Sequence, residues 1–97
     1  MLYEIEIPQG VVNIGEKAFA RLDNLKNIDI PDSVTNITTL AFYRCNGLVS
    51  VQVPGSVTAI KNGTFRECNN LKKVILNEGV AKIEDSAFVF CSSLEQI

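Results

Sequence analysis

Three cysteines stand at a constant spacing of 23 residues, in the segments FYRC, FREC and FVFC that end at Cys45, Cys68 and Cys91. A cysteine thiolate can act as a nucleophile or as a zinc ligand. A nucleophilic cysteine needs a base beside it, and the sequence contains no histidine, the residue that also binds zinc most often. The even spacing differs from the clustered cysteine pairs of zinc sites. These residues therefore argue against catalysis and metal binding, and their spacing indicates a repeated structural position.

The cysteine spacing is the period of a repeat that runs along the whole sequence. Ile28 and Ile30 lie two residues apart, as they do on one face of a β-strand, and matching residues in the other copies keep this alternation. Pro31 follows directly and cannot donate to a continuing strand ladder, so we expect the strand to end there. Four further positions hold one residue type in every copy: Leu25, Leu48, Leu71 and Leu94; Val11, Val34, Val57 and Val80; Ile14, Ile37, Ile60 and Ile83; Phe19, Phe42, Phe65 and Phe88.

Each 23-residue copy is predicted to form one coil, which consists of a strand, a corner, a short second edge, a helical turn around the phenylalanine and a polar corner. A single coil cannot close a core, but stacked coils with strands about 4.8 Å apart bury each apolar column against its neighbours. The sequence therefore predicts a solenoid with a short parallel β-sheet on one face and short helical turns or second edge strands on the other. We expect a single domain over residues 1–97, with repeats at 2–24, 25–47, 48–70 and 71–93 and a partial repeat at 94–97.

The pattern L-x-x-I-x-I-P-x-x-V-x-x-I-x-x-x-A-F-x-x-C, from Leu25 to Cys45, resembles the BspA-like leucine-rich repeat, a 23-residue class of bacterial and some protozoan surface proteins. The resemblance covers residues 2–97. It implies a right-handed leucine-rich-repeat solenoid, no catalytic residues, and a place in proteins that are often displayed at the cell surface and sometimes adhere to host proteins. Three departures occur: Leu22 replaces the first cysteine, Asn77 the last proline and Thr64 an alanine.

The first copy explains what the cysteine position requires. Leu22 stands where later copies have Cys45, Cys68 and Cys91, and leucine shares only volume and apolar character with cysteine. We therefore expect free, buried thiols that pack in one column. Disulfides between neighbouring coils stay geometrically conceivable at the expected strand spacing.

Composition and charge exclude several function classes. The net charge is −2, and the longest basic run is the pair Lys72 and Lys73, so we expect no nucleic-acid partner. No apolar stretch approaches the length of a bilayer span, and the first residues lack the features of a signal peptide, so we expect neither membrane insertion nor a signal peptide in this chain.

Glu84 and Asp85 precede the turn and suit a capping role better than an acid and base pair. No glycine-rich phosphate loop is present, and we expect no cofactor, no metal and no enzymatic activity.

The outer face of the predicted sheet is the candidate site for a protein partner, because repeat proteins use such faces most. Unlike the core columns, the outward columns change from copy to copy. Such variation suits an addressable binding face, and a solvated face without function would show the same variation. The candidate partner-binding residues are Tyr3, Lys26, Asp29, Val49, Gln52, Lys72, Lys73 and Ile75.

Neither end of the sequence carries a polar cap, since the chain opens on a repeat strand and ends at Ile97, a predicted core position. Either the chain is a segment of a longer array, or its ends join other copies in a homo-oligomer. The predicted function is a non-catalytic protein-binding module of a cell-surface, secreted or adhesion-type protein. The alternative is a structural or self-assembling repeat fragment that oligomerises through its ends.

Overall fold

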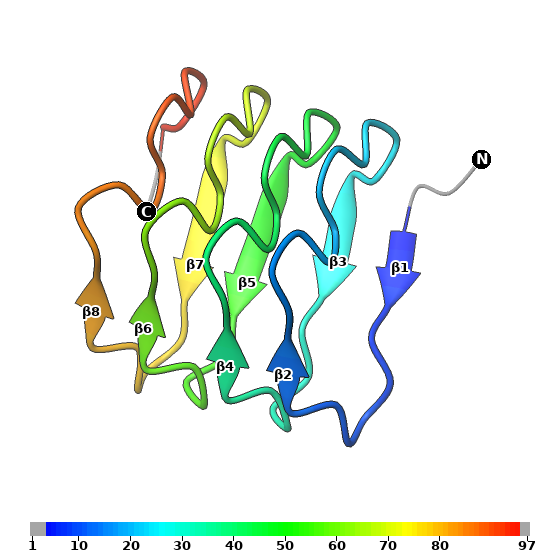
Figure 1. The fold of residues 1–97 in the computed structure, drawn as a ribbon, viewed down its shortest axis with the longest axis vertical. Coiled ribbons are helices and arrows are strands. Elements are labelled where there is room, and N and C mark those ends of the chain that lie inside the picture. The colour runs from blue at the N-terminus through cyan, green and yellow to red at the C-terminus, as the bar shows by residue number, and fades with distance from the viewer. Residues whose placement is uncertain (1–3, 96–97) are drawn as a thin grey trace.

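The chain winds into a stack of coils, and each coil contributes two strands to opposite sides of the stack (Figure 1). A computed structural model describes residues 4–95, with side chains from residue 6 onward. The strands of the first side are β1 (Glu4–Glu6), β3 (Asn27–Asp29), β5 (Ser50–Val53) and β7 (Lys73–Leu76). Those of the second side have two residues each: β2 (Asn13–Ile14), β4 (Asn36–Ile37), β6 (Ala59–Ile60) and β8 (Lys82–Ile83).

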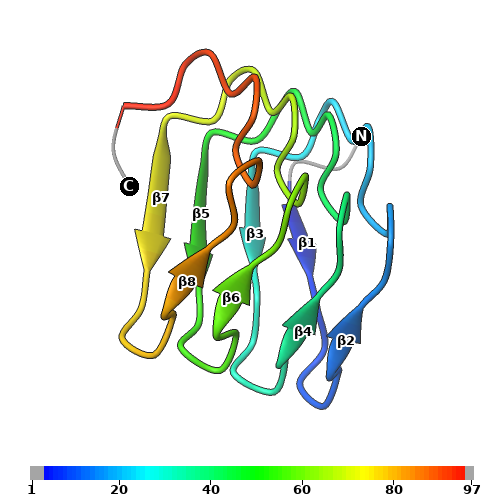
Figure 2. The same cartoon turned by 60° about the vertical axis from the view of Figure 1, so that its left-hand side comes forward.

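All strand pairs are parallel and join counterparts of neighbouring coils, 23 residues apart. Ile28 faces Ile5 across the β1–β3 pair, and Val74 faces Val51 across the β5–β7 pair. The larger sheet has the order β1-β3-β5-β7, and the short strands form the pairs β2-β4 and β6-β8. Figures 1 and 2 show the two rows running in opposite directions on the two sides of the stack. The predicted solenoid, with a parallel sheet on one face and second edge strands on the other, is confirmed.

The strands of the larger sheet end at the column of prolines. Val57 donates its backbone N–H to the carbonyl of Pro54 at 3.0 Å, which closes a turn immediately after β5. The same turn follows Asn77, the residue that replaces proline in the fourth copy, with a 3.2 Å bond from Val80. Asn77 also donates its own N–H to the Val53 carbonyl at 3.0 Å, a ladder bond that proline cannot make. The departure from the repeat pattern therefore keeps the turn and extends the pairing of β7.

The interior consists of single-residue columns that run along the stack. Phe42 and Phe65 are fully buried, and the four phenylalanine rings stack with centroids 5.1–5.3 Å apart and interplanar angles of 10° or less. Burying one phenylalanine side chain contributes about 1.5–3 kcal/mol, and aromatic pairing adds about 0.5–1.5 kcal/mol. Thr64 is also fully buried, and its hydroxyl donates to the Lys61 carbonyl at 2.9 Å, so the polar replacement of alanine is satisfied.

The segment around each phenylalanine forms consecutive tight turns instead of the predicted helical turn. Ala41 and Tyr43 each donate to the carbonyl three residues back, but Leu40 between these turns has a φ of 65°, which a right-handed helix does not contain. Arg44, at 56°, repeats this left-handed geometry. Residues 4–95 form no helix, and therefore none with the length and apolarity to span a membrane.

One predicted core position is exposed. Ile14, Ile37 and Ile60 are buried, whereas the side chain of Ile83 in β8 is 41% exposed. Ile83 lies on the last coil, where no later coil of the described residues packs against it. Ile97, predicted as a core residue of the next strand, lies outside the described residues.

Candidate functional site

The outer face of the larger sheet presents the predicted partner-binding residues. Along β3 and β7, exposed Asp29, Lys73 and Ile75 alternate with buried Ile28 and Val74, because successive strand side chains point to opposite faces. Seven of the eight predicted residues lie exposed on this side of the stack: Lys26, Asp29, Val49, Gln52, Lys72, Lys73 and Ile75. Tyr3 lies outside the described residues. Their assignment to a partner stays a prediction.

Strand register brings these residues together in two rows that run along the stack. In the first row, Asp29 pairs with Gln52 and Gln52 pairs with Ile75 across β3, β5 and β7. The second row lies just before the strands, and it is aligned by backbone bonds of 3.1 Å from Val49 to Lys26 and 2.9 Å from Lys72 to Val49. Each row holds one exposed apolar side chain, Val49 or Ile75, both 39% exposed.

A polar groove of about 570 Å³ runs beside the second row. Lys26, Val49 and Lys72 line it together with residues of the corners before the strands. The corner side chains bind one another from coil to coil: the Asn46 amide donates to the Asp23 carboxylate at 3.4 Å, and the Asn69 amide donates to the Asn46 side-chain oxygen at 3.3 Å. The groove residues are Asp23, Asn24, Lys26, Asn46, Gly47, Val49, Asn70 and Lys72.

Sequence reasoning treated the corner residues only as turn formers and missed the groove. The signal was the polar column of Asp23, Asn46 and Asn69, which repeats with the same period as the core. Gly47 lines the groove, and a Cβ at this position would collide with the carbonyl oxygen of Asp23. The first two corners therefore approach more closely than any larger residue at position 47 would allow.

Charges are distributed unevenly over the sheet face. Lys26, Lys72 and Lys73 give it positive charge near the groove, and Glu6 and Asp29 give it negative charge at the other end of the strands. Neighbouring polar side chains are partly tied together, since Gln52 donates to the Asn77 side chain at 2.9 Å and Ser50 to that of Asn27 at 3.3 Å. The face offers charge, amides and two apolar side chains, which suit recognition of a protein surface.

The cysteine column lies inside the stack and away from this face. The three thiols are free, and each donates to a phenylalanine carbonyl of the preceding coil, at 2.8, 3.1 and 3.0 Å for Cys45, Cys68 and Cys91. The neighbouring thiols of Cys45 and Cys91, together with burial, raise the pKa of the Cys68 thiol well above its ordinary value. Cys68 therefore stays a neutral packing residue. Within the described part of the chain, no group of three side chains could hold a metal ion.

The family model described as BspA type Leucine rich repeat region (6 copies) matches residues 1–97. The chain belongs to this family. Its fold is similar to that of the Treponema pallidum leucine-rich repeat protein TpLRR, with a TM-score of 0.85, 29% identity, and coverage of 96% of this chain and 44% of that one. No protein of curated function matches the sequence significantly.

Two further solved structures of leucine-rich proteins are similar. A leucine-rich repeat protein from Bacteroides ovatus matches with a TM-score of 0.72 and 30% identity, over 96% of this chain and 32% of that one. A leucine-rich cell surface protein from Faecalibacterium prausnitzii matches with a TM-score of 0.69 and 28% identity, over 97% of this chain and 31% of that one. The BspA-type chain described here thus spans less than half the length of each of these proteins.

Proposed function

We propose that this BspA-type repeat is a non-catalytic protein-binding module of a cell-surface protein, and that the outer sheet face with its groove binds the partner. The observation that carries the proposal is the contrast between columns and rows. Four core columns keep one residue type, whereas the outward row of Asp29, Gln52 and Ile75 differs in every coil. The row of Lys26, Val49 and Lys72 alternates between lysine and valine beside a groove of about 570 Å³. The similarity to a leucine-rich cell surface protein supports the location.

The sheet provides a rigid platform for binding. Hydrogen bonds join the backbones of Lys26, Val49 and Lys72 from coil to coil, so their side chains start from fixed positions. Binding therefore costs little conformational entropy of this backbone. Exposed Val49 lies between the two lysines, which places an apolar contact between two charged ones. This arrangement matches the apolar centre and polar rim of protein interfaces.

The size of the face limits the expected affinity. Four strands about 4.8 Å apart and about four residues long present a footprint on the order of 200 Å². A stable complex buries about 800 Å² on each partner. We therefore expect micromolar or weaker binding by this chain, with the corner groove contributing to the contact area.

The proposal is tested by substituting the row beside the groove. The triple variant Lys26→Gln, Val49→Thr and Lys72→Gln is screened with the wild type against purified extracellular proteins by surface biosensor. A matched control, Val12→Thr with Lys17→Gln and Lys82→Gln, removes one exposed apolar residue and two exposed lysines away from the sheet face. We expect every interaction of the wild type to weaken at least tenfold in the row variant and to persist in the control. Equal binding by all three proteins would reject this face as the binding site.

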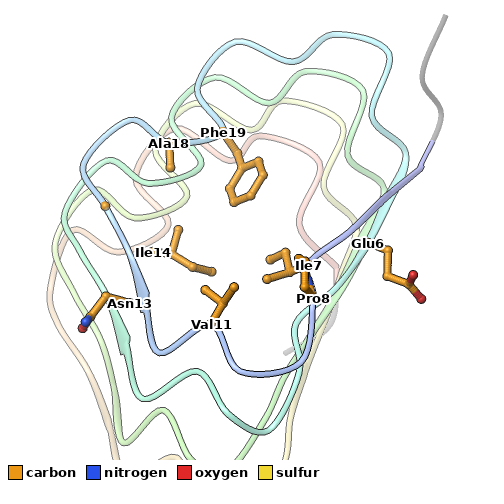
Figure 3. A pocket seen from close by; sticks show the side chains of 9 residues that line it. Glu6, Ile7, Pro8, Val11, Asn13, Ile14, Ala18 and Phe19 are labelled. Atoms are coloured by element: carbon orange, nitrogen blue, oxygen red, sulfur yellow. The ribbon is translucent and has the colours of Figure 1, made fainter.

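A second candidate function, self-assembly, is favoured by an apolar hollow of about 340 Å³ on the first coil. Figure 3 shows Ile7, Val11, Ile14 and Phe19 pointing into this hollow, whereas Glu6 and Asn13 point away. An apolar surface of this kind suits packing against another coil, including the last coil of a second copy.

Light scattering after size exclusion, over a wide concentration range, tests the self-assembly candidate. The alternative predicts a defined oligomer for the wild type and a monomer for Ala18→Lys, because Ala18 lines the hollow and is exposed. A wild-type monomer at all concentrations would contradict self-assembly and would not affect the proposal that the sheet face binds a protein partner.

A further inference from the structure

A second surface, outside the sheet face, is formed by arginine and aromatic side chains that lie just before the polar corners. We call it the arginine edge. Arg21, Arg44, Glu67 and Phe90 occupy the same position of successive coils, and all four have left-handed backbone geometry, with φ between 56° and 63°. The residues preceding three of them complete the edge: Tyr43, Arg66 and Val89.

The backbone of the arginine edge is fixed by bonds between coils. Arg21 donates its N–H to the Tyr43 carbonyl at 2.8 Å, Arg44 to the Arg66 carbonyl at 2.8 Å and Glu67 to the Val89 carbonyl at 2.9 Å. Each side chain therefore leaves the stack from a defined position, one coil apart from the next, at a spacing of about 4.8 Å.

Each arginine of the edge reaches a side chain of the following coil. The Arg21 guanidinium lies over the Tyr43 ring, 5.7 Å from its centre, and Arg66 lies over the Phe90 ring at 5.5 Å. Between them, the Arg44 Nε lies 4.0 Å from the Glu67 carboxylate. The stacked guanidinium groups are held in place by rings, and their N–H groups stay available to a further acceptor.

Stability gives little reason for these side chains. Arg44 and Glu67 are 43% and 33% exposed, and exposed ion pairs contribute little. A left-handed backbone position favours glycine or asparagine, yet this one holds two arginines, a glutamate and a phenylalanine. The Phe90 side chain is 61% exposed, more than the other exposed large apolar residues of the described chain.

We propose that the arginine edge is a second interaction surface and binds an acidic protein segment that carries interspersed apolar residues. The edge carries three guanidinium groups and one carboxylate, that of Glu67, on a chain whose net charge is −2, so it is locally basic on an acidic molecule. Carboxylates bind guanidinium groups bidentately, and Tyr43 and Phe90 supply apolar contacts beside Arg21 and Arg66.

The spacing of the edge suits an extended segment. Arg21 and Arg66 lie two coils apart, at about 10 Å, and alternate side chains of an extended segment lie about 7 Å apart, within the reach of long arginine side chains. A long polyanion such as nucleic acid is disfavoured because the rest of the chain is acidic and Glu67 lies in the middle of the edge.

The test measures binding of a fluorescent 16-residue peptide of aspartate and glutamate with two interspersed tyrosines, by anisotropy at low and moderate salt. The edge variant is Arg21→Gln, Arg44→Gln and Arg66→Gln. The matched control, Lys26→Gln, Lys72→Gln and Lys73→Gln, removes the same charge from the sheet face. We expect at least a tenfold loss of affinity in the edge variant and less than a twofold loss in the control. The same peptide with asparagine and glutamine in place of its acids should not bind.

Two single variants keep the test decisive if the triple variant does not fold. Phe90→Ala should weaken peptide binding several-fold without a change of charge. Glu67→Gln should tighten binding, because it releases Arg44 from its carboxylate partner. Equal losses in the edge variant and the lysine control would show general charge attraction and overturn the proposal. Tighter binding of a 16-nucleotide single-stranded DNA than of the peptide would also overturn it, in favour of a nucleic-acid surface.

Discussion

The interior of the stack and its outer sheet face follow opposite rules in the same strands. Inside, Phe42 and Phe65 occupy one column, are fully buried and stack ring upon ring. Outside, Asp29, Gln52 and Ile75 also share one row in exact register but differ in charge and polarity. The difference separates stability from recognition: a buried position is constrained by its neighbours in the coils before and after, and an exposed position is not.

The largest effect is expected from breaking the phenylalanine column in its middle. Phe65→Ala should lower the free energy of unfolding by about 3–5 kcal/mol, because it leaves a cavity and removes the stacking of Phe65 with Phe42 and Phe88. Phe19→Ala should cost less, since Phe19 is only half-buried and stacks on one ring. Urea denaturation measures both. Equal losses would contradict the view that each ring is stabilised from both sides.

The same contrast explains how much the sequence could predict. Core columns repeat because each must fit identical neighbours, so the period of 23, the parallel register and the inward direction of Leu25 and Ile28 could be read from spacing alone. Periodicity does not reveal which residues of a core column lack a following coil to bury them. Ile83 was therefore predicted as a core residue although it is exposed. The division of the chain into repeats within one domain stays a prediction.

Other features could not be read from the repeat. The left-handed turn at Arg21 and Arg44 holds no glycine or asparagine, so the sequence carried no signal for it and a helical turn was predicted instead. The sheet-face residues were placed on the correct side, but their two rows and the groove depend on how Asp23 and Asn46 pack from coil to coil. The pairing of Arg66 with Phe90, 24 residues apart, depends on side-chain direction.

A close approach between corners is expected to give the next largest effect. Gly47→Ala should destabilise the fold by about 1–3 kcal/mol, because the new Cβ would collide with the Asp23 carbonyl oxygen and force the groove wall to move. Gly15→Ala is the control, since a Cβ there meets nothing within 4 Å, and it should be neutral or slightly stabilising. Thermal denaturation followed by circular dichroism compares the two. A tolerated Gly47→Ala with a harmful Gly15→Ala would contradict this account of the corners.

The thiol column is expected to give a smaller effect that depends on pH. The folded state raises the pKa of Cys68, whereas the unfolded thiol ionises near its ordinary value of 9.0. Above pH 9 the unfolded state binds fewer protons than the folded state, so the stability present below pH 9 is lost as the pH rises. The stability advantage of the wild type over Cys68→Ala should therefore shrink between pH 9 and pH 10. Urea denaturation at both pH values measures it, and an unchanged advantage would show that the Cys68 thiol does not stay neutral.

The smallest effect on stability, with the largest expected effect on binding, comes from exchanging two outward residues. The double variant Lys26→Val and Val49→Lys keeps the composition and net charge of the sheet face and reverses the order of two positions in one row. Its free energy of unfolding should stay within about 0.5 kcal/mol of the wild type, because both side chains are exposed. A partner that reads the row by position should lose at least tenfold in affinity, measured by surface biosensor with the wild type beside it. Unchanged binding would mean that the face attracts partners by its composition alone. The order of side chains from coil to coil would then not determine which partner binds.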